Sequence, residues 1–321
     1  MMYNFINYIQ KGSVKMRNLE KYHGVIPAFY ACYNDDGTVS AERTKALAKY
    51  LLDKGVKGVY VCGSSGECIY QSKEERKLIL ESVMEVAKGK MTVIAHVACN
   101  NTQDSMELAA HAESLGVDAI ASIPPIYFRL PEEAIAKYWN DISSAAPNTD
   151  FVIYNIPQLA GVSLTMPLLR EMLKNPRVVG VKNSSMPTQD IQMFKDEGGD
   201  DIVIFNGPDE QFVAGRAIGA EGGIGGTYGV MPELFLECDR LIKEGNLEKA
   251  RKIQYAINNI IYAMCDCKCN MYAAAKEVLR LQGIDIGDAR KPLVGLKEES
   301  KPLAAKVKKM IDEAKAEFLG E

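Results

Sequence analysis

The chain has 321 residues and 47% of them are hydrophobic, so it can bury a large core, as two ordinary domains or as one barrel with an appendage. Its formal net charge is only −4, and no stretch concentrates Lys and Arg enough to bind nucleic acid or a membrane surface. Eight cysteines at irregular positions are typical of reduced thiols in a cytoplasm, which argues against a disulfide framework.

Residues 1–15, MMYNFINYIQKGSVK, contain no charged leader followed by an unbroken apolar run, so they do not predict a signal peptide. A second methionine, Met16, begins MRNLEKYHGV and is a candidate for the natural start. We therefore expect residues 1–15 to be an N-terminal extension outside the fold. No window of the chain is long and apolar enough to span a bilayer.

From Gly24 onward one unit recurs: a short β-branched run, a turn rich in Gly, Pro and Ser, and an amphipathic segment that often ends in glycine. Eight such units in strict alternation predict a closed (β/α)8 TIM barrel, an α/β fold, over residues 16–245, whereas a doubly wound sheet usually has about five to seven strands. Residues 246–321 show helical patterns without strands and predict a C-terminal helical domain. The runs are GVIPAFYAC from Gly24, GVYVCG from Gly58, TVIAHVAC from Thr92, AIASIPP from Ala119, FVIYNIP from Phe151, VVGVKNSS from Val178, IVIFNGPD from Ile202 and GGIGGTYG from Gly222.

Lys182 is the one lysine within these runs, near the carboxyl end of the sixth. Active sites of TIM barrels lie at this end of the strands and in the loops that follow. A lysine among apolar neighbours has a desolvated ammonium, so its pKa falls and its neutral amine can attack a carbonyl to form a Schiff base. We therefore predict that Lys182 is catalytic; the alternative is a structural lysine paired with a carboxylate across the barrel.

The motif GSSGE follows the second strand, where Ser64, Ser65 and the backbone N–H groups up to Gly66 can converge on a small anion such as a carboxylate. Taken alone, the motif fits an ordinary tight turn with a helix-capping serine better. Beside a Schiff-base lysine it predicts an α-keto-acid site, because such a substrate needs one group for its carbonyl and another for its carboxylate.

Two tyrosines lie at the ends of neighbouring strands: Tyr154 in YNIP at the fifth, and Tyr127 after the two prolines that end the fourth. Schiff-base chemistry needs a proton shuttle, which a phenol within hydrogen-bond reach can supply. Each tyrosine could equally be a buried side chain that only packs. Both are therefore candidates for the proton transfers.

The motif GPDE after the seventh strand places Asp209 and Glu210 at the mouth of the predicted barrel. Adjacent carboxylates repel a phosphate but accept hydrogen bonds from a polyol, so we expect a hydroxylated substrate tail. Asp209 could equally cap the next helix.

We expect no metal, since the chain has only three histidines and the run Cys265, Cys267, Cys269 lacks the spacing of a zinc site; small apolar positions in a helix explain these cysteines better. The glycine-rich GGIGG lacks the spacing and position of a nicotinamide-binding turn. Loops after strands seven and eight of this fold often bind phosphate, which leaves a flavin or pyridoxal phosphate open. We expect no cofactor besides the covalent Schiff base on Lys182.

Together GSSGE, YNIP-x-L-x-G after strand five, GVK in strand six and GPDE resemble the pyruvate-dependent aldolase family of N-acetylneuraminate lyase and dihydrodipicolinate synthase, over nearly the whole chain. The resemblance implies a TIM barrel with C-terminal helices, usually a homotetramer, with pyruvate held as a Schiff base on Lys182. It also implies that Ser64 and Ser65 hold the pyruvate carboxylate, that Tyr154 handles the proton, and that Tyr127 reaches a neighbouring subunit's site. Candidate substrate-binding residues are Ser65, Gly66, Ser184, Gly207, Asp209, Glu210, Gly225 and Gly226.

Within this family the sequence is more similar to the lyase branch. The synthase branch has an arginine two residues after the strand-five proline, where this chain has Leu159. Lyases typically carry GGIGST after strand eight, and here Gly226 replaces that serine, which removes a hydrogen bond worth about 1 kcal/mol. Ser184 stands where lyases usually have threonine, a milder change.

The first hypothesis is a class I carbon–carbon lyase that cleaves a 2-keto-3-deoxy sugar acid into pyruvate and an aldehyde sugar. The favoured substrate is N-acetylneuraminate, which gives pyruvate and N-acetylmannosamine. The alternatives are a lyase for a related sugar acid and dihydrodipicolinate synthase, which condenses pyruvate with aspartate semialdehyde. From a different class, a non-catalytic sensor of pyruvate or sugar acids would not need the nucleophile Lys182.

Overall fold

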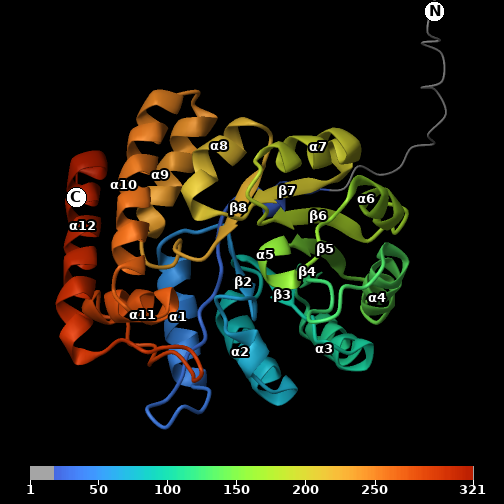
Figure 1. The fold of residues 1–321 in the computed structure, drawn as a ribbon, viewed down its shortest axis with the longest axis horizontal. Coiled ribbons are helices and arrows are strands. Elements are labelled where there is room, and N and C mark those ends of the chain that lie inside the picture. The colour runs from blue at the N-terminus through green and yellow to red at the C-terminus, as the bar shows by residue number, and fades with distance from the viewer. Residues whose placement is uncertain (1–17, 321) are drawn as a thin grey trace, which may run out of the picture.

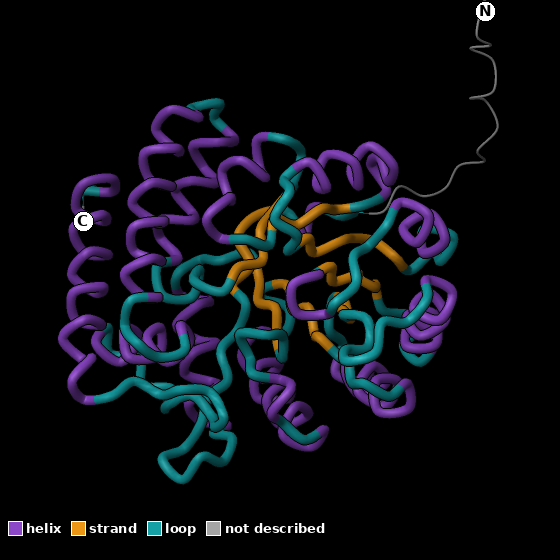
Figure 2. The backbone as a smooth tube through the Cα atoms, in the orientation of Figure 1, coloured by secondary structure: helices purple, strands orange, loops and turns teal. Residues whose placement is uncertain are grey.

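The computed structural model describes residues 18–320, so the predicted extension over residues 1–15 lies outside the described part. Eight parallel strands form a barrel surrounded by helices, which confirms the predicted TIM-barrel fold (Figures 1 and 2). The sheet runs in the order β1, β8, β7, β6, β5, β4, β3, β2, and a parallel bridge between Ala28 and Tyr60 joins its two ends. The strands are β1 (Gly24–Pro27), β2 (Gly58–Val61), β3 (Thr92–His96), β4 (Ala119–Ser122), β5 (Asp150–Asn155), β6 (Val178–Asn183), β7 (Val203–Asn206) and β8 (Gly222–Gly225).

The strands are buried on both faces, because helices cover the outside of the barrel and side chains fill its inside. Successive side chains of a strand point to opposite faces. Val152 of β5 therefore belongs to the cluster along the barrel axis, with Tyr60 and Phe205, whereas Ile153 belongs to the larger cluster between strands and helices. This two-sided burial explains why the strand runs are almost continuously apolar.

Several of the outer helices begin at a capping side chain. Ser40 Oγ accepts the backbone N–H of Arg43 at the start of α1, and Ser72 and Glu75 form a reciprocal capping box at the start of α2. The helices between the strands are α1 (Ala41–Asp53), α2 (Lys73–Ala87), α3 (Thr102–Leu115), α4 (Glu132–Ser144), α5 (Pro157–Ala160), α6 (Met166–Met172), α7 (Gln189–Gly198) and α8 (Phe212–Ala217).

After β8 the described chain contains helices joined by turns and loops, and no further strand. It contains α9 (Pro232–Lys243), α10 (Leu247–Cys265), α11 (Met271–Leu281) and α12 (Lys301–Leu319). Helix α10 packs against α9 and α12, and α11 packs against α12 beside the barrel (Figure 1). The division into a barrel over residues 16–245 and a separate C-terminal domain stays a prediction. Within residues 18–320, no helix has the length and apolar character needed to cross a membrane.

Candidate active site

Lys182 lies inside the barrel near the carboxyl end of β6. Its register partners are Tyr154 on β5 and Phe205 on β7, and the residue is only 4% exposed. Its Nζ lies 3.9 Å from the ring centroid of Tyr154 and 4.3 Å from that of Tyr60, so two aromatic faces surround the amine. Within the described chain no carboxylate is in ion-pair contact with Lys182; the Asp209 carboxylate acts on it from a distance. The alternative of a lysine paired across the barrel therefore does not hold.

Burial dominates the electrostatics of Lys182. It lowers the pKa of the ammonium from 10.5 to about 7, because the charged form loses its hydration inside the barrel. The Asp209 carboxylate opposes this shift, since an anion stabilises the ammonium. At neutral pH roughly half of the molecules carry the neutral amine, which is the nucleophilic form.

Tyr154 is also buried, at 3% exposure. Burial raises the pKa of its phenol to about 12, and hydrogen-bond interactions with the hydroxyls of Ser64 and Ser184 oppose the rise. Its ring packs edge-to-face on Tyr60, with the centroids 5.7 Å apart. The structure therefore gathers these hydroxyls beside Lys182, and the phenol keeps its proton at neutral pH.

Two hydrogen bonds close the turn after β2. The backbone N–H of Gly66 donates to the carbonyl of Gly63, and that of Glu67 donates to the carbonyl of Ser64, both at 3.0 Å. Ser65, in the middle of the turn, is 3% exposed. The two predicted serines thus lie on a closed turn at the same end of the barrel as Lys182.

Asp209 joins the loops after β7 and β8. Its Oδ1 accepts the backbone N–H of Gly226 at 3.1 Å, and its Oδ2 accepts both the N–H and the hydroxyl of Thr227 at 2.6 Å. A Cβ added to Gly225 would lie 2.1 Å from Asp209 Oδ1, so a glycine is needed there. Burial raises the pKa of Asp209 to about 6. Both oxygens of Asp209 are therefore engaged by the protein, whereas the neighbouring Glu210 is exposed.

Gly207 permits the close approach of the loop after β7 to Ser184. Its N–H donates to the carbonyl of Asn183 at 2.8 Å, and an added Cβ would lie 2.6 Å from the same oxygen. We expect Gly207→Ala to lower the free energy of unfolding by about 1–3 kcal/mol, because the backbone must shift to relieve this overlap. Urea denaturation measures the loss. Gly295→Ala is the control, since among residues 18–320 no atom beyond its own chain neighbours lies within 4 Å of a Cβ there. An equal loss in both variants would contradict the packing argument.

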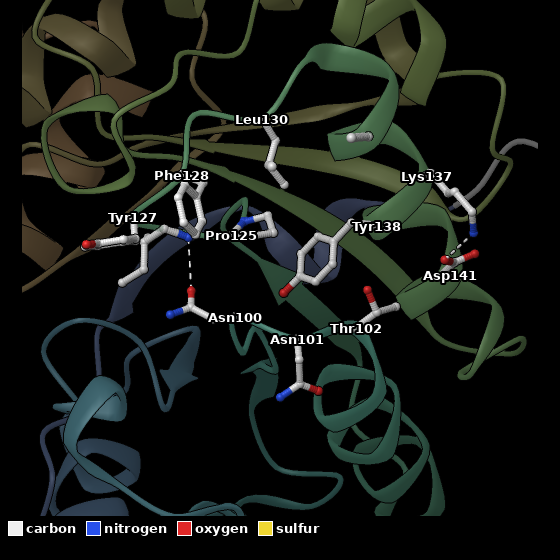
Figure 3. Close-up of a pocket in the computed structure, with 12 residues that line it drawn as sticks. Asn100, Asn101, Thr102, Pro125, Tyr127, Phe128, Leu130, Lys137, Tyr138 and Asp141 are labelled. Carbon is white, nitrogen blue, oxygen red and sulfur yellow. Dashed lines mark hydrogen bonds and ion pairs between the residues drawn. The ribbon is translucent and has the colours of Figure 1, made fainter.

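The structure leaves Tyr127 exposed, whereas the residues above are buried. Tyr127 is 90% exposed and packs edge-to-face on Phe128, itself 72% exposed. Both rings line a groove of about 720 Å³ next to the loop after β4, where the N–H of Ile126 donates to Asn100 Oδ1 at 3.0 Å (Figure 3). The single chain therefore does not bring Tyr127 into the buried group around Lys182.

Two further tyrosines belong to the site although neither was predicted. Tyr60 of β2 is fully buried, and its hydroxyl has no hydrogen-bond partner among the described residues. The signal in the sequence that could have pointed to Tyr60 was an aromatic residue between two valines in the run GVYVCG. Tyr272 of α11 interacts through its hydroxyl with Ser65, and its pKa is raised by burial. No local pattern links a residue of a late helix to a turn after the second strand.

The cysteine run and the histidines show no metal-binding arrangement. Cys265 is exposed, Cys267 is buried and Cys269 is half-buried, and all three are free. His96 is buried with Nδ1 2.9 Å from the carbonyl of Cys62. In the part of the chain that the structure describes, no three His, Cys, Asp or Glu side chains are grouped so that they could hold a metal ion.

Comparisons with known proteins agree with this geometry. A curated N-acetylneuraminate lyase from Mediterraneibacter gnavus is 64% identical over 313 residues, which are 97% of this chain and 99% of that protein. A curated N-acetylneuraminate lyase from Escherichia coli is 33% identical over 280 residues, 87% of this chain and 93% of that protein. The solved structure of a Ruminococcus gnavus sialic acid aldolase, a catalytic lysine mutant, is 65% identical with a TM-score of 0.94 and matches 94% of this chain and 100% of that chain.

The sequence profile of the dihydrodipicolinate synthetase family matches residues 21–313. This match spans the barrel strands and most of the C-terminal helices. The resemblance inferred from the motifs is therefore confirmed, and the chain belongs to the dihydrodipicolinate synthetase family.

Proposed function

We propose that this protein is a class I lyase that cleaves N-acetylneuraminate into pyruvate and N-acetylmannosamine through a Schiff base on Lys182. The observation that carries the proposal is a buried lysine that has no ion-pair partner among residues 18–320 and whose pKa is about 7. The 64% identical relative from Mediterraneibacter gnavus is named for this reaction, and the 65% identical aldolase is described as a catalytic lysine mutant. Both similarities extend over almost the whole chain.

The reaction begins when the neutral amine of Lys182 attacks the C2 carbonyl of the open-chain sugar acid. The new C–N bond, with transfer of one amine proton to the former carbonyl oxygen, gives a carbinolamine, which must lose its hydroxyl as water to become a protonated imine. That departure needs a proton, and the Tyr154 phenol carries one at neutral pH because its pKa is raised to about 12. The hydroxyls of Ser64 and Ser184 lie within reach to support the transfer.

The protonated imine is the electron sink for the next step. Tyr154, now deprotonated, takes the proton of the C4 hydroxyl, and the C3–C4 bond breaks. The electron pair of this bond moves toward the imine and forms an enamine on Lys182. N-acetylmannosamine leaves as the aldehyde. The enamine then takes this proton from Tyr154 at C3, and water hydrolyses the imine to release pyruvate and the free amine of Lys182. Every electron pair is accounted for without a redox partner, so we propose that no cofactor is required.

The turn after β2 supplies the carboxylate subsite in this proposal. Ser64 and Ser65, with their hydroxyls and their own backbone N–H groups, hold the carboxylate that becomes part of pyruvate, whereas the N–H of Gly66 is already donated to Gly63. A Cβ at Gly226 would lie 3.2 Å from Ser65 Oγ, so the glycine in place of the lyase serine leaves extra room beside this subsite. A related sugar acid is therefore the second substrate to test.

The loops after β6, β7 and β8 supply the rest of the substrate site. Ser184 and Gly207 lie in contact, and Gly225 makes room for Asp209. Since both Asp209 oxygens are engaged by the loop after β8, the exposed Glu210 is the carboxylate that we assign to the hydroxyl tail of the sugar acid.

We also propose a cytoplasmic homotetramer. All eight cysteines are free, which suits a reducing compartment. The exposed rings of Tyr127 and Phe128 are apolar surface that a neighbouring subunit would cover, and Tyr127 would then reach that subunit's site. Light scattering coupled to size-exclusion chromatography measures the assembly.

A screen for pyruvate release tests the proposed reaction. Purified protein is incubated with N-acetylneuraminate and with a panel of 2-keto-3-deoxy sugar acids, and pyruvate is measured with lactate dehydrogenase. We expect the highest kcat/KM with N-acetylneuraminate; release from another sugar acid alone would keep the reaction class and change the substrate. Condensation with aspartate semialdehyde would support the synthase instead, although Leu159 supplies no cation for a second carboxylate.

The pH dependence gives a further prediction. Only the neutral amine attacks, so kcat/KM falls about tenfold per pH unit below the Lys182 pKa of about 7. Asp209 raises this pKa, so Asp209→Asn is expected to move the acid limb to lower pH, measured by kcat/KM from about pH 5 to 9. The control Glu210→Gln removes the neighbouring exposed carboxylate and leaves the limb in place. An unchanged limb in Asp209→Asn would contradict the coupling.

A further inference from the structure

The glutamate that ends the GSSGE motif is part of a fully buried ion pair with a C-terminal helix. Lys276 Nζ of α11 donates to Glu67 Oε1 at 2.7 Å, and neither side chain has exposed surface. The second oxygen, Glu67 Oε2, accepts the backbone N–H of Arg290 at 2.9 Å. The carboxylate therefore binds the C-terminal segment with both oxygens, and the proposed mechanism leaves it without a role.

The surroundings of the pair satisfy both charges. Lys276 Nζ also donates to the carbonyl of Asp288 at 2.9 Å and lies 4.7 Å from the ring centroid of Tyr33. The Arg290 guanidinium also lies over the Tyr33 ring, with its Cζ 4.4 Å from the ring centroid. A buried ion pair with this many partners is weak evidence for stability, because desolvation offsets most of its Coulomb energy. A role in holding one geometry is the better explanation.

The geometry that the pair holds is that of the serine turn. Glu67 has a φ of 54°, in the left-handed region that residues other than glycine seldom adopt. In this conformation its N–H closes the turn on the carbonyl of Ser64 at 3.0 Å. The same residue thus carries the unusual backbone conformation and the buried anchor, directly after Ser64, Ser65 and Gly66.

We propose that Lys276, acting through Glu67, is a positioning residue for the carboxylate subsite, so that helix α11 sets the shape of the turn that holds the substrate. The inference rests on the proposed function in one respect, the assignment of the pyruvate carboxylate to Ser64 and Ser65. Without the ion pair Glu67 is released from its left-handed conformation, Ser64 loses the donor on its carbonyl, and the two hydroxyls no longer converge. Lys182 and Tyr154 sit on β6 and β5 and keep their places.

The test compares Lys276→Met with the double variant Glu67→Gln/Lys276→Met, which removes both charges of this ion pair. The double variant is used for the test if Lys276→Met does not fold. The matched control is Arg216→Met. It breaks another buried ion pair, in which Arg216 Nη2 lies 2.8 Å from Asp239 Oδ1 and the two side chains are 9% and 8% exposed. This pair lies beside Gly24, at the amino end of the strands and therefore opposite the proposed active site. Each variant is titrated with pyruvate, trapped with borohydride and weighed by intact-mass spectrometry, and its KM and kcat are measured.

We expect the pyruvate concentration for half-maximal trapping, and the KM for the sugar acid, to rise at least tenfold in both Lys276 variants. We expect maximal trapping to be retained and kcat to fall less than threefold, because the nucleophile and the proton shuttle are untouched. The double variant should regain thermal stability relative to Lys276→Met without regaining affinity. The control Arg216→Met should lose thermal stability and keep the wild-type pyruvate concentration for half-maximal trapping.

A purely structural role predicts one of two other results. Either both Lys276 variants have lower melting temperatures and a wild-type pyruvate concentration for half-maximal trapping, or the double variant regains pyruvate affinity together with its thermal stability. Either result overturns the inference and leaves the proposed function intact. If the wild-type protein itself traps no pyruvate, the proposed function fails first, and the inference falls with it.

Discussion

Replacing Lys182 with methionine is expected to abolish the reaction and at the same time to stabilise the fold. The variant has no amine to attack the keto acid, so we expect kcat/KM to fall by more than about 10⁴-fold, as for the loss of other covalent nucleophiles. Methionine fills a similar volume among Tyr60, Tyr154 and Phe205 and carries no charge. The buried ammonium is thus removed from an apolar site without leaving a large cavity.

The sign of the stability change follows from the two pKa values. The Lys182 pKa is about 7 in the folded protein and 10.5 in an exposed lysine, so the unfolded chain binds the proton more tightly. As the pH falls from about 10.5 to 7, the wild type therefore loses stability by up to about 1.4 kcal/mol for each pKa unit, and below pH 7 the loss is constant. At pH 7 the free energy of unfolding of Lys182→Met is expected to exceed that of the wild type by about 2 kcal/mol or more. This difference should shrink as the pH rises.

Two measurements check this prediction. Borohydride trapping with pyruvate should add mass to the wild type and none to Lys182→Met, and calorimetry at several pH values should show the stability difference. The control Lys309→Met replaces a 75% exposed lysine and should leave both unchanged. A Lys182 variant that still forms the adduct, or that is less stable than the wild type at pH 7, would contradict the assignment of a desolvated nucleophile.

Replacing Tyr154 with phenylalanine is expected to lower kcat by about 10²–10⁴-fold, the usual contribution of a positioned proton-transfer group. The ring that lies 3.9 Å from Lys182 Nζ remains, so the lysine should keep its lowered pKa and the acid limb of the pH profile should stay in place. Trapping with pyruvate should still reach completion, although more slowly. The defect would thus appear in cleavage and proton transfer, not in the capacity to form the adduct.

Tyr60→Phe is the matched control for this variant. Its ring also lies over Lys182 Nζ, at 4.3 Å, but its hydroxyl has no hydrogen-bond partner among the described residues. We expect near wild-type kcat from Tyr60→Phe, measured in the same pyruvate-release assay. Equal losses in the two variants would show that the reaction depends on either hydroxyl near the amine and not on the Tyr154 proton in particular.

Much of the barrel could be predicted because burial on both faces leaves continuous apolar runs along each strand. The ends of the strands could not be placed as well. The run GVIPAFYAC continues five residues beyond β1, which ends at Pro27, because the residues from Ala28 to Cys32 are buried although they are outside the strand. Apolar composition reports burial, and it does not distinguish a strand from a buried loop.

The residues at the strand ends were found because topology alone brings the carboxyl ends of parallel strands together. Lys182 and Tyr154 share a register position on adjacent strands, which follows from their places at the ends of their runs. The contributions of Tyr272 and Lys276 could not be predicted, because they depend on how α11 packs against a turn about 200 residues earlier in the chain. The exposure of Tyr127 likewise depends on what a neighbouring chain covers.

The carboxylate that links the loops after β7 and β8 limits how this protein could acquire a new substrate range. A side chain introduced at Gly225 must displace Asp209, because its Cβ would overlap with Asp209 Oδ1, and a replacement of Asp209 by a residue without a side-chain acceptor frees three donors on Gly226 and Thr227 at once. Directed evolution that randomises one of these loops alone should mostly yield unstable clones. Libraries that vary both segments jointly are the ones in which altered sugar selectivity should emerge.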